Sequence, residues 1–110
     1  MADVDSVRFE LSGDLSLRDT AELKSRLTTA LSDKRSLVIE TDGVGGIDVS
    51  CLQVLVAAQK SANAAGMPMR LTASASGPLG RAMIAAGFHA PDGRPLIPEA
   101  ETWTLTREAR

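Results

Sequence analysis

Residues 37–58, LVIETDGVGGIDVSCLQVLVAA, set the architecture of this chain. Residues 37–39 form a short, uninterrupted apolar run, which is typical of a central strand covered on both faces. The glycine-rich residues 40–48 then predict a loop, and apolar residues recur at helical spacing over 51–65. Gly66 is a normal helix stop. A buried strand that leads through a loop into a helix predicts an α/β fold.

The residues before this region predict a hairpin and a helix. Residues 7–11 alternate apolar and polar side chains, as in a half-buried strand. Gly13-Asp14 then predicts a turn, and Leu15 and Leu17 indicate a short second strand antiparallel to the first. Apolar residues at helical spacing over 19–31 predict the first helix.

The residues after it continue the alternation of strands and helices. Residues 67–71 predict a strand, and Ser76-Gly77-Pro78 opens a third helix. Residues 102–106 indicate a last strand, in which Trp103 packs rather than binds. The predicted order is β-β-α-β-α-β-α-β, and strands joined by helices require a mostly parallel or mixed β-sheet with packed helices. We expect a single domain over residues 1–110, with its core at about 7–89.

Composition excludes several classes of function. The chain has 110 residues, of which 44% are hydrophobic and 24% charged, so it is not a disordered sequence. Twelve basic against fourteen acidic residues leave a net charge of −2, which disfavours nucleic-acid binding. We find no apolar run of the ~18 residues that a membrane span needs, and no basic start of a signal peptide. We therefore expect a cytoplasmic protein with no direct membrane insertion.

The inventory of reactive side chains predicts no enzyme, no metal site and no cofactor. Cys51 is the single cysteine, which excludes an intramolecular disulfide and a cysteine-rich zinc site. His89 is the single histidine, and its neighbours Gly87 and Pro91 are typical of a surface or loop position. Nucleophile-elbow, phosphate-loop and dinucleotide-binding motifs do not occur.

Ser50 precedes the predicted second helix, and its position allows two interpretations. Its hydroxyl can cap the helix, with Gln53 returning to its backbone amide in a capping box. Alternatively, the positive end of the helix dipole stabilises a phosphoryl group on this hydroxyl. Asp48 can orient the hydroxyl, meet a partner's metal–nucleotide site, or bond loop amides in an Asx turn.

The order of elements and one motif resemble the STAS domain, which occurs in anti-sigma factor antagonists and in the cytosolic parts of sulfate transporters. The resemblance covers about residues 7–89 and is strongest over IDVSCLQVL, residues 47–55. The segments LSGDL, LVIE and AGMPMRL support it, at residues 11–15, 37–40 and 65–71. The family's signature is a hydrophobic strand ending in Asp, a short loop, and then Asp-Ser-Ser/Thr-Gly-Leu.

Matched residue by residue, Asp48 takes the position of the family's Asp and Ser50 that of its phosphoacceptor. The chain departs from the signature twice. Glu40 replaces the Asp at the end of the strand, and Cys51 replaces the Gly after the phosphoacceptor. The Cys51 side chain occupies a place where a partner's backbone would approach, and it is either a redox-sensitive thiol or a small buried side chain.

The resemblance implies a non-enzymatic, anti-sigma factor antagonist-like module for signal transduction in the bacterial cytoplasm. In this partner switching, an anti-sigma factor with serine kinase activity binds the unphosphorylated domain, and phosphorylation at Ser50 releases it. The expected binding surface is the loop 41–49 and the start of the helix, in particular Asp42, Asp48, Val49, Cys51 and Gln53. Alternatives are a small subunit that supports the ATPase of a lipid-transport ABC system, or a partner in a chemotaxis or histidine-kinase complex.

Overall fold

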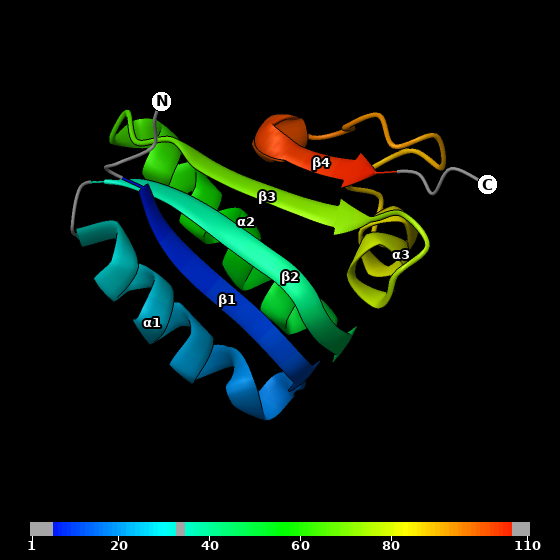
Figure 1. The fold of residues 1–110 in the computed structure, drawn as a ribbon, viewed down its shortest axis with the longest axis horizontal. Helices are drawn as coiled ribbons and strands as arrows, with labels where there is room; N and C mark the ends of the chain where they lie inside the picture. The colour runs from blue at the N-terminus through cyan, green and yellow to red at the C-terminus, as the bar shows by residue number, and fades with distance from the viewer. Residues whose placement is uncertain (1–5, 33–34, 107–110) are drawn as a thin grey trace.

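The structure is a computed structural model in which residues 6–32 and 35–106 are described. The described chain forms one four-stranded sheet with three α-helices and two 3-10 helices (Figure 1). In chain order the elements are β1 (Ser6–Leu15), η1 (Leu17–Asp19), α1 (Thr20–Ser32), β2 (Ser36–Ile47), α2 (Val49–Ala64), β3 (Met69–Ser74), α3 (Pro78–Ala85), η2 (Pro98–Thr102) and β4 (Trp103–Thr106).

The strands lie in the sheet in chain order, β1-β2-β3-β4, and every neighbouring pair is parallel. Parallel neighbours need a crossover, and α1, α2 and the segment containing α3 and η2 provide the three crossovers. The predicted α/β class with packed helices is confirmed. The described strands form a purely parallel sheet rather than a mixed one.

The predicted antiparallel hairpin near the start of the chain is wrong. Leu15 is the last residue of β1 and pairs with Ile47 of β2, while Leu17 begins η1. Gly13 has a φ of +77°, but it lies inside β1, where the register with β2 shifts between Gly13 and Asp14. The left-handed conformation of Gly13 therefore serves a bulge and not a turn, so the strand continues.

The predicted loop over residues 40–48 is also mostly strand, since β2 extends to Ile47. Its glycines let β1 approach closely. A Cβ atom at Gly43 would lie 2.9 Å from the Cβ of Ser12, and one at Gly45 would lie 2.7 Å from Oδ1 of Asp14. The glycine run therefore reflects tight pairing of two bulged strands rather than a flexible connection.

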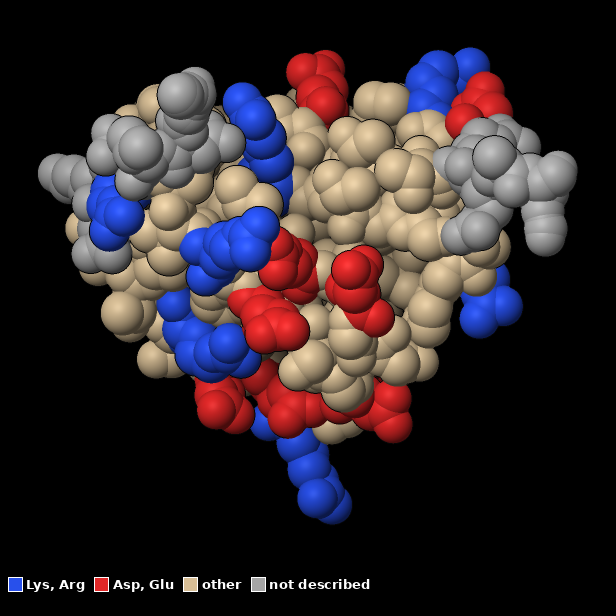
Figure 2. All heavy atoms as spheres, viewed as in Figure 1, with Lys and Arg blue, Asp and Glu red and all other residues tan. Residues whose placement is uncertain are grey.

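The sheet buries one face and leaves the other polar. Alternate residues of the four strands pack under the helices, among them Phe9, Leu11, Leu37, Ile39, Met69, Leu71, Trp103 and Leu105. In Figure 1, α2 passes behind β2 and β3, so the view is onto the opposite face. Figure 2 shows charged side chains gathered there. An ion pair of 3.1 Å joins Arg8 of β1 to Glu40 of β2. Residues 37–39 are thus not covered on both faces, and Val38 stays half-buried.

The C-terminal part of the described chain completes the core around β4. Trp103 is buried as predicted, and its backbone oxygen lies 3.0 Å from Nε2 of His89. His89 is only 1% exposed, which contradicts its predicted surface position. The residue follows a turn, but the chain folds back through a bridge between His89 and Pro95 and carries the ring beneath β4. Because a carbonyl only accepts, Nε2 is the donor in this contact.

Candidate functional site

Ser50 is the second residue of α2 and lies just beyond the end of β2. Asp48 is the N-cap of α2, and its Oδ2 accepts from the backbone N–H of Ser50 at 2.9 Å and from the Ser50 hydroxyl at 2.6 Å. The predicted capping by Ser50 is therefore wrong, because the helix starts two residues earlier than expected. Since Asp48 takes the Ser50 amide hydrogen, Gln53 does not complete a capping box there.

A second hydroxyl joins this arrangement from α1. Thr20 Oγ1 lies 3.0 Å from Ser50 Oγ and donates to the backbone oxygen of Leu17 at 2.8 Å. The two hydroxyls hold two protons for three close contacts. Asp48 takes the Ser50 proton, so the Thr20 hydroxyl proton is shared between the Leu17 carbonyl oxygen and Ser50 Oγ, both of which can accept. The Ser50 hydroxyl is thus held by the Asp48 carboxylate on one side and by the Thr20 hydroxyl on the other.

The site carries negative charge. The hydrogen bonds from the Ser50 hydroxyl and then the Ser50 backbone N–H hold the pKa of Asp48 below its ordinary value of 3.8. The backbone N–H of Asp48 donates to Leu15 at 2.8 Å, which fixes the carboxylate next to the end of β1. Asp14, Asp19 and Glu22 line a hollow of ≈200 Å³ at this end of β1, and Figure 2 shows acidic side chains along this edge.

Two exposed apolar residues belong to the segments that meet at Ser50: Val49 precedes it in α2, and the backbone oxygen of Leu17 accepts from Thr20, whose hydroxyl contacts Ser50. Leu17 in η1 is 68% exposed and Val49 in α2 is 56% exposed, and Leu96 is the third large apolar side chain of this kind among the residues described. Sequence reasoning missed Leu17 by placing it in a strand. The signal was the capping pattern Ser16-x-x-Asp19, which forms with a 2.7 Å bond from the Ser16 amide to Asp19 and starts η1.

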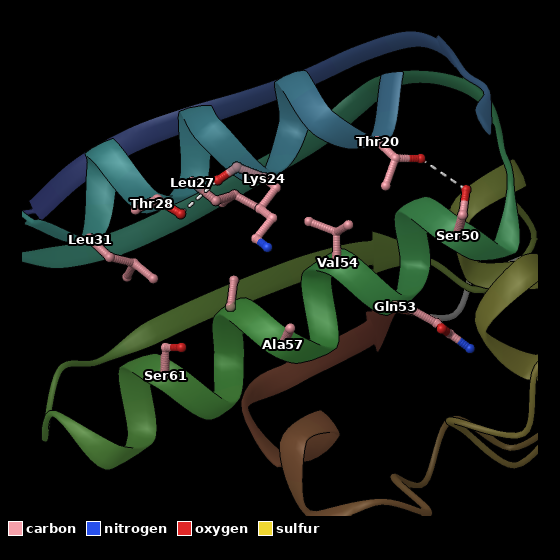
Figure 3. A pocket seen from close by; sticks show the side chains of 11 residues that line it. Thr20, Lys24, Leu27, Thr28, Leu31, Ser50, Gln53, Val54, Ala57 and Ser61 are labelled. Carbon is pink, nitrogen blue, oxygen red and sulfur yellow. Dashed lines mark hydrogen bonds between the residues drawn. The ribbon is translucent and has the colours of Figure 1, made fainter. Parts of the chain in front are cut away.

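A groove of ≈440 Å³ lies between α1 and α2 (Figure 3). Thr20 and Ser50 stand at one end, while Leu31 and Ser61 stand at the other. Gln53, which the sequence analysis assigned to partner binding, lines the same groove. We refer to the residues lining this space as the α1/α2 groove.

The other predicted contact residues lie apart from this cluster. Asp42 is exposed and lines a separate hollow of ≈100 Å³ beside Gly77 and Pro78, where α3 begins. Cys51 is 0% exposed, and its Sγ lies 3.3 Å from the backbone oxygen of Ser16. This burial contradicts a partner contact through the Cys51 side chain and supports its interpretation as a small buried residue.

Over residues 6–32 and 35–106, no three side chains of histidine, cysteine, aspartate or glutamate come together as a metal site. None of the helices in the described part of the chain has the length and apolar character to cross a membrane.

Comparison with known families agrees with the fold. A family model described as "Mlab, STAS domain" matches residues 2–98, which is most of the 110 residues. No curated protein matches the chain. STAS domains are generally non-enzymatic modules that interact with protein partners. The chain belongs to the STAS domain family.

Proposed function

We propose that this chain is a cytoplasmic regulatory module whose protein partner docks on the end of the domain that carries Ser50. The observation that supports the proposal is the exposure of Leu17 and Val49, which belong to the two segments that meet at the Thr20–Ser50 contact. Exposed apolar side chains grouped at one place, with acidic groups around them, are typical of a protein-binding surface. The complementary partner surface is apolar at its centre and basic at its rim.

Phosphorylation of Ser50 is the proposed switch. The hydroxyl lies at the positive end of the α2 dipole, where an added phosphate is stabilised. Phosphorylation removes the proton that Ser50 gives to Asp48 and adds about −1.5 to −2 charges beside that carboxylate. A dianion at Ser50 must lose water when an apolar partner docks, so the partner dissociates. The resemblance to anti-sigma factor antagonists indicates an anti-sigma factor with serine kinase activity as this partner.

A second function follows if Ser50 is not phosphorylated. The contacts to Asp48 and Thr20 already give the hydroxyl a structural role, because they tie the start of α2 to the start of α1. This observation favours a constitutive partner, such as the ATPase of a lipid-transport ABC system. In that case the same surface binds continuously.

Capture of partners from the native host separates the two functions. Wild type, Ser50→Ala and Ser50→Asp serve as baits, and mass spectrometry quantifies the proteins retained. The switch predicts a serine kinase that wild type and Ser50→Ala retain and that Ser50→Asp binds at least tenfold more weakly, or about 1.4 kcal/mol. A transport ATPase held equally by all three baits supports the constitutive function.

Matched surface variants test the docking surface itself. Leu17→Asp should lose the partner under either function, while Leu96→Asp, which changes the third exposed apolar residue, should retain it. Ser61→Asp adds the same charge to α2 far from Ser50 and should also bind. Retention of the partner by Leu17→Asp would contradict the proposed surface.

A further inference from the structure

The α1/α2 groove has the size of a small-molecule site. Its volume of ≈440 Å³ falls within the range of roughly 300–1,000 Å³ that is typical of such sites. It is lined by 11 residues, whereas a standard protein interface uses about 20–30 on each side. These two dimensions favour a small ligand over a docked protein segment.

The walls of the groove are mainly apolar. Leu31 projects from α1 and Val54 from α2 (Figure 3), while Leu27 also lines the groove but is only 1% exposed. On α2, the small side chains of Ala57 and Ala58 leave space in the groove. Because Leu27 and Leu31 are one helical turn apart, the apolar wall follows the helix axes, and it suits an unbranched hydrocarbon chain.

Lys24 supplies the single charge among the residues that line the groove. Its side chain points from α1 into the groove toward α2 in Figure 3. The ion pairs found in the described part of the chain are Arg8–Glu40 and Arg94–Asp92, so Lys24 has no carboxylate partner there. A cation above an apolar channel is complementary to an anion that carries an apolar tail.

The charges around the groove favour a ligand whose polar end carries a single negative charge. One ammonium balances one carboxylate. Asp48 at the Ser50 end is ionised at neutral pH and repels a second negative charge. The hydroxyl of Thr28, one turn beyond Lys24, donates to the backbone oxygen of Lys24 and adds a polar edge beside the headgroup.

We propose that the α1/α2 groove binds a single-chain fatty acid. Its carboxylate pairs with Lys24, and its hydrocarbon chain runs along Leu27 and Leu31 toward Ser61. The site is additional to the partner surface at Leu17 and Val49. It shares with that surface only the end of the groove at Thr20 and Ser50.

Titration of the full chain with decanoate tests this site, with calorimetry to measure affinity and amide chemical shifts to locate the ligand. We expect saturable binding of one decanoate per chain, with shifts along α1 and α2. Lys24→Met keeps most of the apolar stem and should weaken binding at least tenfold. Lys60→Met removes an exposed lysine of the same helix pair that does not line the groove, and it should bind as wild type.

Further ligands and variants separate the contribution of charge to binding from that of hydrophobic contact. Decanol should bind with no difference between wild type and Lys24→Met, and acetate should not bind. Ala57→Phe fills the groove from an exposed position and should abolish decanoate binding with the thermal unfolding midpoint retained. Leu17→Asp should bind decanoate normally, so failure of the partner surface and failure of this site are distinguishable. Absence of saturable binding, or equal loss in Lys24→Met and Lys60→Met, overturns the proposal.

Discussion

The indole Nε1 of Trp103 donates a 2.7 Å hydrogen bond to Oε1 of Gln59, joining β4 to α2 across 44 positions of sequence. Both side chains are fully buried. The amide nitrogen of Gln59 donates in turn to Asn63 at 3.0 Å, so both ends of the Gln59 amide are used. This is a satisfied polar link inside an otherwise apolar core.

Replacement of Gln59 by Leu should lower the free energy of unfolding by about 1–3 kcal/mol. The substitution leaves the Trp103 N–H buried without an acceptor, and the desolvation cost of that group sets the magnitude. Denaturant unfolding measures the change. Asn63→Ala removes the acceptor of the Gln59 Nε2 group, but at an exposed position where water can replace it, so its loss should be smaller than that of Gln59→Leu. Equal midpoints for Gln59→Leu and wild type would contradict the role of the link.

Asp48 should make the stability of the protein depend on acid pH. Its pKa is lowered in the folded protein by the Ser50 bonds, so its stabilising effect is fully present above the unfolded value and is lost as pH falls through the folded pKa. The stability difference between wild type and Asp48→Asn should therefore be constant from pH 5 to 7 and shrink below about pH 4. Unfolding midpoints at pH 7, 5, 4 and 3 measure it. Asp42→Asn serves as the control, and a pH-independent difference would exclude the Asp48 contribution.

Gly80→Ala should destabilise the protein although alanine is the better helix former. A Cβ atom at Gly80 would lie 2.1 Å from the backbone oxygen of Ser74, so α3 must move away from the end of β3. Overpacking of this kind costs about 1–3 kcal/mol, which exceeds the gain of up to ~1 kcal/mol in helix propensity. Gly45→Ala is the matched case, because its Cβ meets the movable carboxylate of Asp14, and its loss should be smaller. We expect Gly45→Ala to have the higher thermal unfolding midpoint of the two variants, and the reverse order would contradict this explanation.

Ser50 and Thr20 should be energetically coupled. Ser50→Ala removes the contacts to Asp48 and Thr20 but keeps the backbone N–H that Asp48 caps, so we expect a loss of about 0.5–1.5 kcal/mol. Thr20→Val removes the contact from the other side. A double-mutant cycle should give a coupling energy of at least about 0.5 kcal/mol. Additive losses would mean that the 3.0 Å contact contributes nothing to stability.

The helices and the α/β class were predictable because hydrophobic spacing distinguishes helices from strands, and strands joined by helices require crossover connections. Gly13-Asp14 misled the prediction, since the same residues serve a tight turn and a bulge inside a strand. The glycines of residues 43–46 were similarly ambiguous. Only the position of β1 beside them shows that they permit close strand pairing instead of forming a loop.

The candidate site was predictable as a motif but not as a geometry. Asp48 and Ser50 are both favoured capping residues, and the extended backbone at Asp48 (φ −78°, ψ 152°) is what makes it the cap. Thr20 and Ser50 are 30 positions apart in the sequence, so local sequence patterns cannot predict their contact. The burial of His89 likewise depends on a carbonyl group 14 positions away.

The parallel sheet, whose strands follow one another in chain order, has a consequence for synthesis on the ribosome. Each strand that emerges pairs with the strand made before it, so the sheet grows at one edge. The end of the domain with Leu17, Thr20, Asp48 and Ser50 is complete once α2 has been translated. Trp103, the partner of Gln59, is translated much later. All residues of this end of the domain are therefore synthesised before Trp103, the residue that bonds Gln59 in the core.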